Sequence, residues 1–535
     1  PNKSAVRNPV TTPITHWRKL LVFAVFASLI WYACTPQNQP TITANVITSS
    51  GINYLSPNMP FDIDTTVKKQ LEAEGKFAEV QRLFEVLSWQ AFIGLNWPYQ
   101  DGQAQPSITS DGSPKWNSWK ESFEVYKSDG SAPSPWGEYD IPDKLEGAIT
   151  TDCNKVLYRT SKFSHTTSDF ADEIDQAFST KIWDQNGNIA RYEVRMNEVE
   201  FDYLVENQLY NFDGQIAFAK KNGSPVVNFP SGSRSEEGAI EIKLAWKIIE
   251  DNDPFAGRYH TTEACVYNED KTFSAAKVGL IGMHISLKTL SSPQWIWATF
   301  EHVDNLEVNP LEVYNGKNLK PSFNDPDCGI CPINVLPTDT TNFGGVQNGT
   351  IKNQIQRVIP IPMATQALNT EVQAQLKSAN SPFQYYQLIG TQWPTQPKAA
   401  AYPVGKPGDN SERKLPDAVT NKSGGFPTPT YLTNMIMETY FQGATQGADY
   451  NYLIANEPSW LQIEGFPKSA KDANIRIFGT EGCTGCHSSC SIAIDSTRDA
   501  SGKLQPVFAQ RYDYDSQVIG DFSWLMQLKA SFATK

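Results

Sequence analysis

The sequence predicts an α+β protein. A large β-rich domain with an N-terminal helix, residues 61–430, comes before a small all-α module, residues 469–535. Helical spacing of apolar side chains over residues 77–95 predicts the helix, and alternation of apolar and polar residues in the middle of the chain predicts strands. Helical spacing returns near the C-terminus. Because 535 residues exceed the usual size of one compact core, we expect at least two domains.

The composition excludes two classes of protein. Hydrophobic residues make up 40% of the chain and charged residues 19%, which is typical of a soluble globular body and excludes a protein with many membrane spans. The formal net charge is −13. An acidic surface repels phosphate backbones, so we expect no nucleic-acid partner. The 14 Trp and 21 Tyr residues favour a sheet-rich architecture.

The N-terminus has the features of an export signal. Its basic residues precede an apolar run that extends from Leu20 to Ala33 and ends at Cys34. This order predicts a lipoprotein-type signal peptide over residues 1–34, with cleavage and lipidation at Cys34. Trp31 stands where such signals usually carry Leu, so an uncleaved anchor and a cleaved, soluble form stay open as alternatives. We expect an exported protein of the periplasm or cell envelope, held to a membrane through its N-terminal lipid.

Two segments are expected to connect the folded parts. Residues 35–60 are polar and contain three prolines, which predicts a tether rather than a packed element. Residues 431–468 are predicted to contain a helix, residues 431–441, followed by a connector.

The β-rich domain begins with a helix and contains three clear strands. The apolar residues of Phe77–Leu95 recur at helical spacing, which predicts a helix with those bounds. Ile240–Ile248 alternates apolar and polar residues, which predicts a half-buried strand. Residues 278–290 and 295–303 are predicted as two more strands, joined by a Ser-Ser-Pro turn.

The C-terminal module is predicted from two helices. Residues 469–478 form a short one that ends at Gly479, and residues 524–532 form an amphipathic one at the end of the chain. Between them lies the sequence Cys483-Thr484-Gly485-Cys486-His487, which has the pattern C-x-x-C-H.

The C-x-x-C-H pattern predicts covalent attachment of a haem. Two thiols at this spacing can add to the vinyl groups of adjacent pyrroles, and the next imidazole then lies beneath the iron as an axial ligand. We therefore expect one haem c, bound through Cys483 and Cys486, with His487 as the proximal iron ligand. The alternative is a structural disulfide beside an incidental histidine.

Several segments resemble known haem proteins. Residues 470–488, AKDANIRIFGTEGCTGCHS, resemble the haem-attachment helix and loop of class I cytochromes c. Five further segments resemble exported bacterial proteins of the single-haem cytochrome c family: SWQAFIGLNWP (88–98), GMHISLKT (282–289), PQWIWATFEHVDN (293–305), METYFQ (437–442) and GDFSWL (520–525). The resemblance implies haem binding and electron transfer, and it names no substrate.

The second axial ligand of the iron is less constrained. Class I cytochromes c take a Met from the chain after the motif, and here Met526 is the only one. It falls inside the predicted final helix, where a Met more often packs in a core. His284 and His302 of the β-rich domain are further candidates, followed by Met435 or Met437. A vacant position is also open.

Two weaker patterns lie in the β-rich domain. Cys328 and Cys331 form a second C-x-x-C, for which we expect a structural disulfide rather than a metal or redox site. Glu301, His302 and Asp304 look like a catalytic cluster. On a strand, however, His302 and Asp304 share one face and Glu301 points to the other, so a structural hydrogen bond is favoured over an acid–base role.

Electron transfer is the function that the sequence favours, and no catalytic residue can be assigned. The acidic body is suited to docking on basic redox partner proteins. A haem-dependent oxidoreductase or haem sensor is the alternative, because a carrier needs only a small module and the large β-rich domain would then bind the substrate. A lipoprotein without haem is the remaining hypothesis.

Overall fold

The computed structural model describes much of the chain between residues 52 and 534. The described ranges are 52–140, 155–157, 181–268, 272–307, 313–314, 317–328, 331, 333–334, 346–347, 350–357, 360–394, 432–439, 482–487, 490–510 and 518–534. The chain divides into two compact units, residues 1–39 and residues 40–535, and every described residue belongs to the second. The predicted signal peptide with Cys34, and the predicted helix over residues 469–478, lie outside the described residues.

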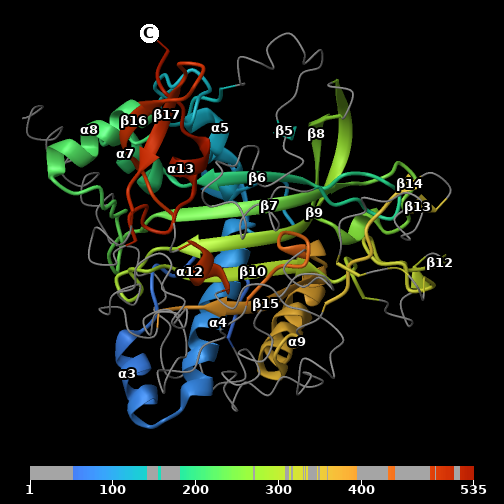
Figure 1. Cartoon of the computed structure of the whole chain (residues 1–535). Coiled ribbons are helices and arrows are strands. Elements are labelled where there is room, and N and C mark those ends of the chain that lie inside the picture. Colours follow the sequence, from blue (N-terminus) through green and yellow to red (C-terminus); the bar gives the residue numbers. More distant parts are fainter. Residues whose placement is uncertain are drawn as a thin grey trace, which may run out of the picture. The chain divides into compact units, whose positions relative to one another are not determined.

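The centre of the second unit is a sheet that is antiparallel except at one short pairing (Figure 1). Six strands follow one another in the order β15 (Tyr386–Gln392), β10 (Ile296–His302), β9 (Phe273–Leu287), β7 (Ile240–Ile248), β6 (Arg191–Met196) and β4 (Lys120–Glu121). The N-terminal half of β9 also pairs with β8 (Thr261–Tyr267), and β8 pairs in parallel with β5 (Val156–Leu157). The three predicted strands are confirmed as β7, β9 and β10, although β9 begins and ends earlier in the chain than the predicted range 278–290.

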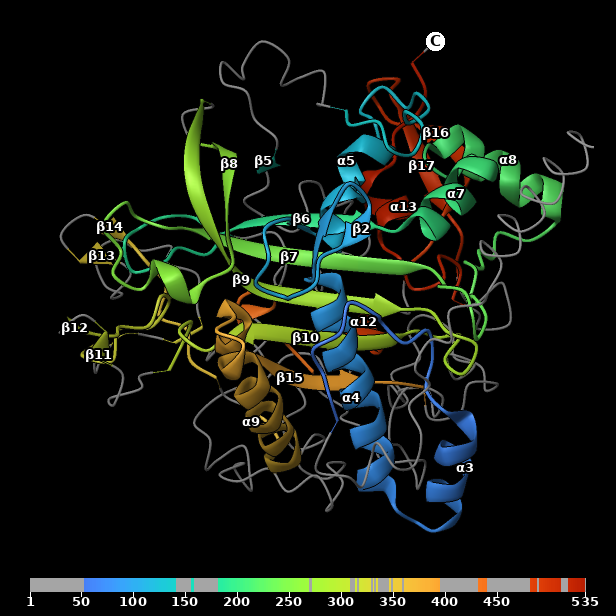
Figure 2. The same cartoon turned by 180° about the vertical axis from the view of Figure 1, so that it is seen from behind.

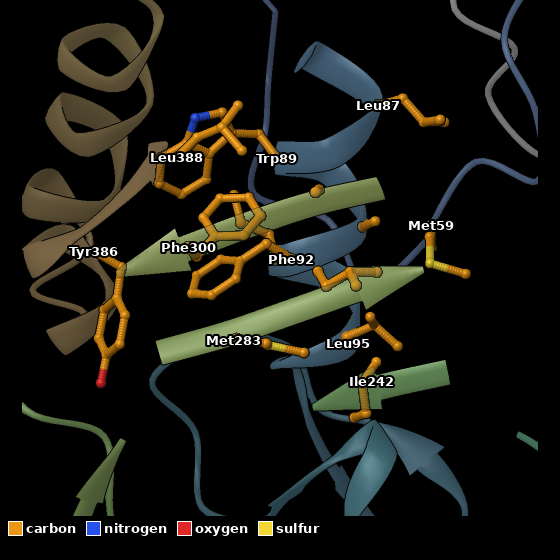
Figure 3. Packing of buried hydrophobic residues seen from close by; sticks show 14 of the residues in the cluster. Met59, Leu87, Trp89, Phe92, Leu95, Ile242, Met283, Phe300, Tyr386 and Leu388 are labelled. Atoms are coloured by element: carbon orange, nitrogen blue, oxygen red, sulfur yellow. The ribbon is translucent and has the colours of Figure 1, made fainter. Parts of the chain in front are cut away.

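One face of the sheet is covered by two helices, α4 (Phe77–Leu95) and α9 (Met363–Ser378), as Figure 2 shows. The bounds of α4 are those predicted from its apolar spacing. Phe92 of α4 stacks on Phe300 of β10 with 4.3 Å between ring centroids, and Trp89 meets the Phe300 ring edge-on at 4.9 Å. Figure 3 shows these rings beside Met283 and Leu388 of the sheet. Together they form a continuous hydrophobic core between α4, α9 and the sheet.

The opposite face of the sheet carries polar and aromatic side chains in rows that cross the strands. The register aligns Lys243, His284 and Thr299 in one row, and Glu241, Ser286 and Trp297 in the next. Because side chains alternate along a strand, both rows point away from α4. The short helix α12 (Gly482–His487) lies over this face in Figure 1, and residues 432–439 and 518–524 also bond to it. Strand β7 is therefore covered on both faces, where its alternation predicted one exposed face.

The C-terminal region does not form the predicted all-α module, and this part of the predicted fold class is wrong. Its described residues 490–534 contain the antiparallel hairpin of β16 (Ala493–Arg498) and β17 (Leu504–Phe508). The turn of the hairpin is held by Asp499, whose Oδ1 accepts the backbone N–H groups of Ser501 and Lys503 at 2.9 and 3.0 Å. The prediction missed this turn because the strands beside it are polar and partly exposed, without a clear alternation of apolar residues.

The predicted final helix is shorter than expected. Residues 524–532 were predicted as helical, and the observed helix α13 spans Leu525–Lys529. Ala530 is extended, with φ −64° and ψ 155°, and beyond it the backbone N–H of Thr534 donates to the carbonyl of Asp129 at 2.8 Å. Tertiary hydrogen bonding to a distant loop therefore replaces the last predicted turn of helix.

The end of the predicted tether is packed against the body. Tyr54 is 1% exposed, its backbone N–H donates to Gln375 at 3.0 Å, and its hydroxyl donates to Glu371 at 3.2 Å. Ile52 and Met59 are buried as well. The tether prediction is thus wrong for residues 52–60, because a few apolar anchors in a polar segment are enough to dock it.

The helix predicted over residues 431–441 is not formed in its described part. Residues 432–434 have no regular secondary structure, and residues 435–437 form a turn in which the backbone N–H groups of Met437 and Glu438 donate to the Asn434 carbonyl. The carboxylate of Glu438 accepts the backbone N–H of Asn434 at 2.7 Å, and the Asn434 amide donates to Thr299 and to the Phe300 carbonyl at 3.0 and 2.9 Å. Side-chain bonds of this kind compete with helix formation, and here they fasten the segment to the sheet.

The remaining elements are as follows: α3 (Thr65–Ala73), α5 (Ser122–Val125), α7 (Glu198–Glu206), α8 (Phe212–Asn222), β1 (Pro98–Gln100), β2 (Gln103–Ala104), β3 (Ser113–Pro114), β11 (Val313–Tyr314), β12 (Lys317–Asn318), β13 (Val346–Gln347), β14 (Thr350–Ile351), and the 3-10 turns η1 (Lys115–Ser118), η2 (Ala256–Arg258) and η3 (Pro382–Tyr385). Within the described part of the chain, no helix combines the length and the apolar character that crossing a membrane requires.

The core beneath α4 gives a direct test of the fold. We expect Phe92→Ala to lower the free energy of unfolding by about 3–5 kcal/mol, because a fully buried ring between Phe300 and Trp89 leaves a cavity when it is removed. Urea denaturation followed by circular dichroism measures the loss. Leu290→Ala is the control, since Leu290 is 59% exposed and its removal should cost less than about 0.5 kcal/mol. Equal losses in the two variants would contradict the assignment of this core.

Candidate functional site

The C-x-x-C-H sequence forms helix α12, which is anchored to strand β15. The backbone N–H and the hydroxyl of Thr484 both donate to Oε1 of Gln392, each at 2.8 Å. Both residues are buried. Gln392 is the register partner of Trp297 on β10. This double hydrogen bond therefore fixes α12 over the part of the sheet that carries Trp297.

A backbone carbonyl holds His487 in one tautomer. Nδ1 of His487 lies 2.7 Å from the carbonyl oxygen of Phe522, which can only accept a hydrogen bond. Nδ1 must therefore carry the proton, and Nε2 is unprotonated in the neutral ring. Burial lowers the pKa of His487 to about 4, so the ring is neutral at pH 7. Trp297 packs against the imidazole with 4.5 Å between ring centroids, which limits rotation of the ring.

A strained turn presents the Phe522 carbonyl to the imidazole. Asp521 and Phe522 have φ values of +47° and +68°, a left-handed conformation that is unfavourable for residues with large side chains. The Asp521 carboxylate holds the turn in place, because it accepts the backbone N–H of Phe229 at 2.6 Å and forms an ion pair with Lys288. Backbone strain is typically retained where it serves a function, and here it aims one carbonyl at His487.

The Lys288–Asp521 ion pair is buried. Lys288 is 2% exposed and also donates to Oδ1 of Asn228 at 2.8 Å. Burial raises the pKa of Asp521 to about 6, although Lys288 opposes that rise, and burial lowers the pKa of Lys288, although Asp521 opposes that fall. Each charge thus depends on the other, so removal of either partner would leave an uncompensated buried charge.

Cys483 is half-buried beside an apolar patch. Its Sγ lies 3.7 Å from the carbonyl oxygen of Leu432, the distance of a weak thiol hydrogen bond. Ile361, Ile389 and Leu432 pack around it. Positions 483 and 486 are three residues apart in α12, a spacing that places two positions on the same side of a helix.

The segment of residues 432–439 brings a carboxylate close to the site. Oε1 of Glu438 lies 3.1 Å from Nε2 of His284, and both side chains are mostly buried. The backbone N–H of Met435 donates to Glu301 at 2.6 Å. His284 and Glu438 both influence the pKa of His487, which shows that the three groups lie within electrostatic range.

The candidates for the second iron ligand do not all lie on the same face of the sheet as His487. His284 is on the same face of the sheet as Trp297 and α12. Met437 is 1% exposed, and its Cε lies 3.3 Å from the position that a Cβ on Gly282 would take, which puts it on the same face. Met435 is fully buried in the same segment.

Met526 and His302 are held by other contacts. Met526 is fully buried in α13, within the apolar cluster that also contains Trp297 and Phe522, and its carbonyl accepts a hydrogen bond from Gln215 at 2.9 Å. His302 shares the α4 side of β10 with Phe300, so it lies on the opposite face of the sheet from α12. The structure therefore does not bring His302 together with His487.

Glu301, His302 and Asp304 belong to structural networks. Nδ1 of His302 accepts the Asp304 backbone N–H at 3.1 Å, and Nε2 bonds to the Arg258 carbonyl at 3.1 Å, so both ring nitrogens are engaged. Arg258 pairs with Asp304 through two contacts of 2.5 and 2.6 Å. Glu301 points to the other face and pairs with Arg357. The strand geometry predicted this separation of faces.

The other described cysteines are structural. Cys328 and Cys331 form a disulfide, as predicted from their spacing, and Cys265 is also disulfide-bonded. Cys490 is buried, and burial raises its pKa well above the usual range, which makes its thiol unreactive. A Cβ on Gly520 would approach Sγ of Cys490 to 2.8 Å, so the turn before Asp521 packs tightly on this thiol.

The described donor atoms on α12 are one imidazole nitrogen and one thiol. Among the residues that the structure describes, no group of three or more His, Cys, Asp or Glu side chains is arranged to hold a metal. A haem iron needs only one or two protein ligands, since the porphyrin supplies four nitrogens. The unprotonated Nε2 of His487 and the thiol of Cys483 on one short helix are the donors that such a group uses.

No protein-family model, no curated protein and no solved structure matches this chain. The resemblance of the quoted segments to single-haem cytochromes c therefore stays a prediction.

Sequence reasoning missed the residues that orient the site. Gln392, Phe522, Asp521 and Lys288 are far from the C-x-x-C-H in sequence and carry no motif of their own. The block GDFSWL contains Asp521 and Phe522, and its resemblance to cytochrome segments was the one signal that pointed to them.

The buried ion pair that supports the Phe522 turn can be tested. We expect Asp521→Asn to lower the free energy of unfolding by about 3–5 kcal/mol, because Lys288 loses its counter-charge in a buried site. The double variant Lys288→Met/Asp521→Asn should recover part of the loss, and urea denaturation measures both. Asp327→Asn is the control, since the Lys320–Asp327 pair is 75% and 82% exposed and contributes under about 1 kcal/mol. A loss at Asp521 no larger than the control's would remove this support for the turn.

Proposed function

We propose that this chain binds one haem c covalently through Cys483 and Cys486, with His487 as an axial iron ligand, and transfers electrons outside the cytoplasm. One observation carries the proposal. The histidine of a C-x-x-C-H sequence donates its Nδ1–H to the Phe522 carbonyl at 2.7 Å. Imidazoles that bind iron commonly use their second nitrogen in this way, because the bond fixes the tautomer and directs Nε2 to the metal.

The surrounding residues support a one-electron carrier. The haem supplies a one-electron couple when it is bound. The Phe522 carbonyl keeps the proton of His487 on Nδ1, and Trp297 restricts the ring. Trp297 and Phe522 are 5% and 3% exposed, so they cover part of the imidazole, which is itself half-buried. These residues provide a fixed ligand that need not rearrange when an electron arrives.

The predicted export signal and the charge support the location and the partners. Haem c is attached after export, and the N-terminal sequence predicts an exported lipoprotein of the periplasm or cell envelope. The formal charge of −13 favours association with basic redox proteins through electrostatic attraction. We infer that such proteins supply and receive the electron.

We further propose His284 as the second axial ligand. It lies on the same face of the sheet as α12 and within electrostatic range of His487. An ionised Glu438 can only accept a hydrogen bond, so Nε2 of His284 carries the proton in this pair. A carboxylate behind a ligating imidazole increases its basicity. His302 is a poorer candidate, because both of its ring nitrogens are engaged and it lies on the other face of the sheet.

Covalent haem attachment is tested with protein expressed beside haem-maturation machinery. The pyridine haemochrome assay and the intact mass should show one haem c per chain in the wild type. Cys486→Ala and Cys483→Ala should each lose a thioether bond, because each supplies one of the two sulfurs. Cys490→Ala is the matched control, a buried cysteine outside the motif that should keep the full haem content. A colourless wild type would falsify the proposed function.

Iron coordination is tested separately by magnetic circular dichroism of the ferric protein. We expect the signature of two histidine ligands in the wild type and its loss in His284→Ala, whose reduced form should also bind CO rapidly. Met526→Leu should keep the wild-type spectrum. A His/Met signature, or rapid CO binding by the wild type, would contradict His284. Rapid CO binding would in turn favour a haem enzyme or a sensor over a carrier.

A further inference from the structure

One buried carboxyl group and one half-buried carboxyl group lie near the turn that holds His487. Glu200 of α7 is fully buried, and Glu241 of β7 lies on the covered face of the sheet. The hydroxyl of Ser523 donates to Oε2 of Glu241 at 2.8 Å, and Ser523 directly follows Phe522. The residue that bonds to Glu241 is therefore adjacent in the chain to the residue whose carbonyl accepts the hydrogen bond from His487.

Glu200 lacks the contacts that a buried anion requires. Neither of its carboxyl oxygens has a hydrogen-bond partner among the described residues, and the same is true of the hydroxyl of Tyr126. Tyr126 is itself within electrostatic range of Glu200 and Glu241. An unpaired, unsolvated carboxylate is very unfavourable, so the group that satisfies Glu200 is a proton.

The cations nearby do not neutralise both glutamates. Lys288 pairs with Asp521, and Lys243 is the cation that faces Glu241 from its own strand. The thiol of Cys490 also lies within range of Glu241 and Asp521, and its pKa is raised so that it stays neutral. The surroundings of the two glutamates thus hold more carboxyl groups than positive charges.

The two glutamates do not release their protons together. Burial raises the pKa of Glu241 to about 7, although Ser523 and Lys243 lower it. Burial raises the pKa of Glu200 well above its usual range, and the charges of Glu241 and Asp521 add to the rise. Glu241 ionises first, because it accepts a hydrogen bond that stabilises its anion and Glu200 accepts none.

We propose that Glu241, with Glu200 as its neutral neighbour, is a proton-binding site coupled to the redox state of the haem, an inference that rests on the proposed function. The register places Glu241 two strands from Trp297, whose ring contacts His487. Two strand spacings amount to about 10 Å, within the range of electrostatic interaction in a buried region.

The coupled step is balanced in charge and atoms. A basic electron-donor protein supplies one electron to the site. The added negative charge favours an O–H bond on the Glu241 carboxylate, and the proton comes from solvent. When an acceptor protein removes the electron, that O–H bond breaks and the proton returns to solvent. We expect about a tenfold change in the proton affinity of Glu241 between the two states, which converts to about 59 mV for a one-electron couple.

Redox titration of the haem-loaded protein at a series of pH values tests the proposal. The wild-type midpoint potential should fall by about 59 mV in total as the pH rises through the neutral range, and it should be flat on either side. The sign follows because the reduced state binds the proton more tightly. Glu241→Gln should make the potential independent of pH. Glu85→Gln is the matched control, because Glu85 is a buried glutamate of α4 with a raised pKa, on the other side of the sheet, and its removal should keep the wild-type dependence.

Two further measurements guard against a misfolded variant. Ser523→Ala removes the hydrogen bond that lowers the pKa of Glu241, together with a longer bond of 3.4 Å from the Leu525 backbone N–H, so the pH-dependent window should move to higher pH. Infrared spectroscopy at neutral pH, in protein with or without haem, should show a protonated carboxyl band that weakens in Glu200→Gln. Near-ultraviolet circular dichroism confirms that each variant is folded.

The outcomes separate this inference from the proposed function. A wild type without haem overturns both. A wild type with haem and a pH-independent potential overturns only the proton coupling, as does a Glu241→Gln variant that keeps the wild-type dependence.

Discussion

The hydrogen bond from His487 to the Phe522 carbonyl is the contact on which the candidate site depends. Helix α12 has six residues, and a helix of this length is unstable by itself because the cost of nucleation is not recovered. Its position is set from both ends instead. At the start of α12, Gln392 accepts a hydrogen bond from Thr484, and at its end the Phe522 carbonyl accepts one from His487. The orientation of the imidazole is therefore a tertiary property.

The two faces of the central sheet differ in character: one packs against the hydrophobic core, and the other carries the polar groups of the candidate site. Its α4 face is apolar and interlocked by rings such as Phe92 and Phe300, which supplies the burial that a large domain requires. Its other face contains His284, Glu241 and the turn at Asp521, groups whose burial is unfavourable unless each finds a partner. A strained turn and a buried ion pair persist there because the apolar face provides stability in excess.

The periodicity of apolar residues correctly predicted the elements whose conformation depends mainly on nearby sequence. Phe77–Leu95 and Ile240–Ile248 have the predicted bounds, because their burial follows one periodic rule from end to end. The C-x-x-C-H is equally local. The hairpin β16–β17 and the segment of residues 432–439 were mispredicted, because long-range contacts and polar side-chain bonds decide their conformations. No spacing rule could have paired His487 with Phe522, since that pair depends on how the chain returns across the sheet.

These long-range contacts show that the described C-terminal residues pack as part of the β-rich domain. A separate haem module would carry its own supporting residues. Here α12 is anchored by Gln392, its histidine packs on Trp297, and the Asp521 turn bonds to Lys288, all of which come from the β-rich part of the chain. A fragment limited to residues 469–535 lacks each of these partners. The sheet is therefore one wall of the candidate site around α12, and the large domain supplies the contacts that orient His487.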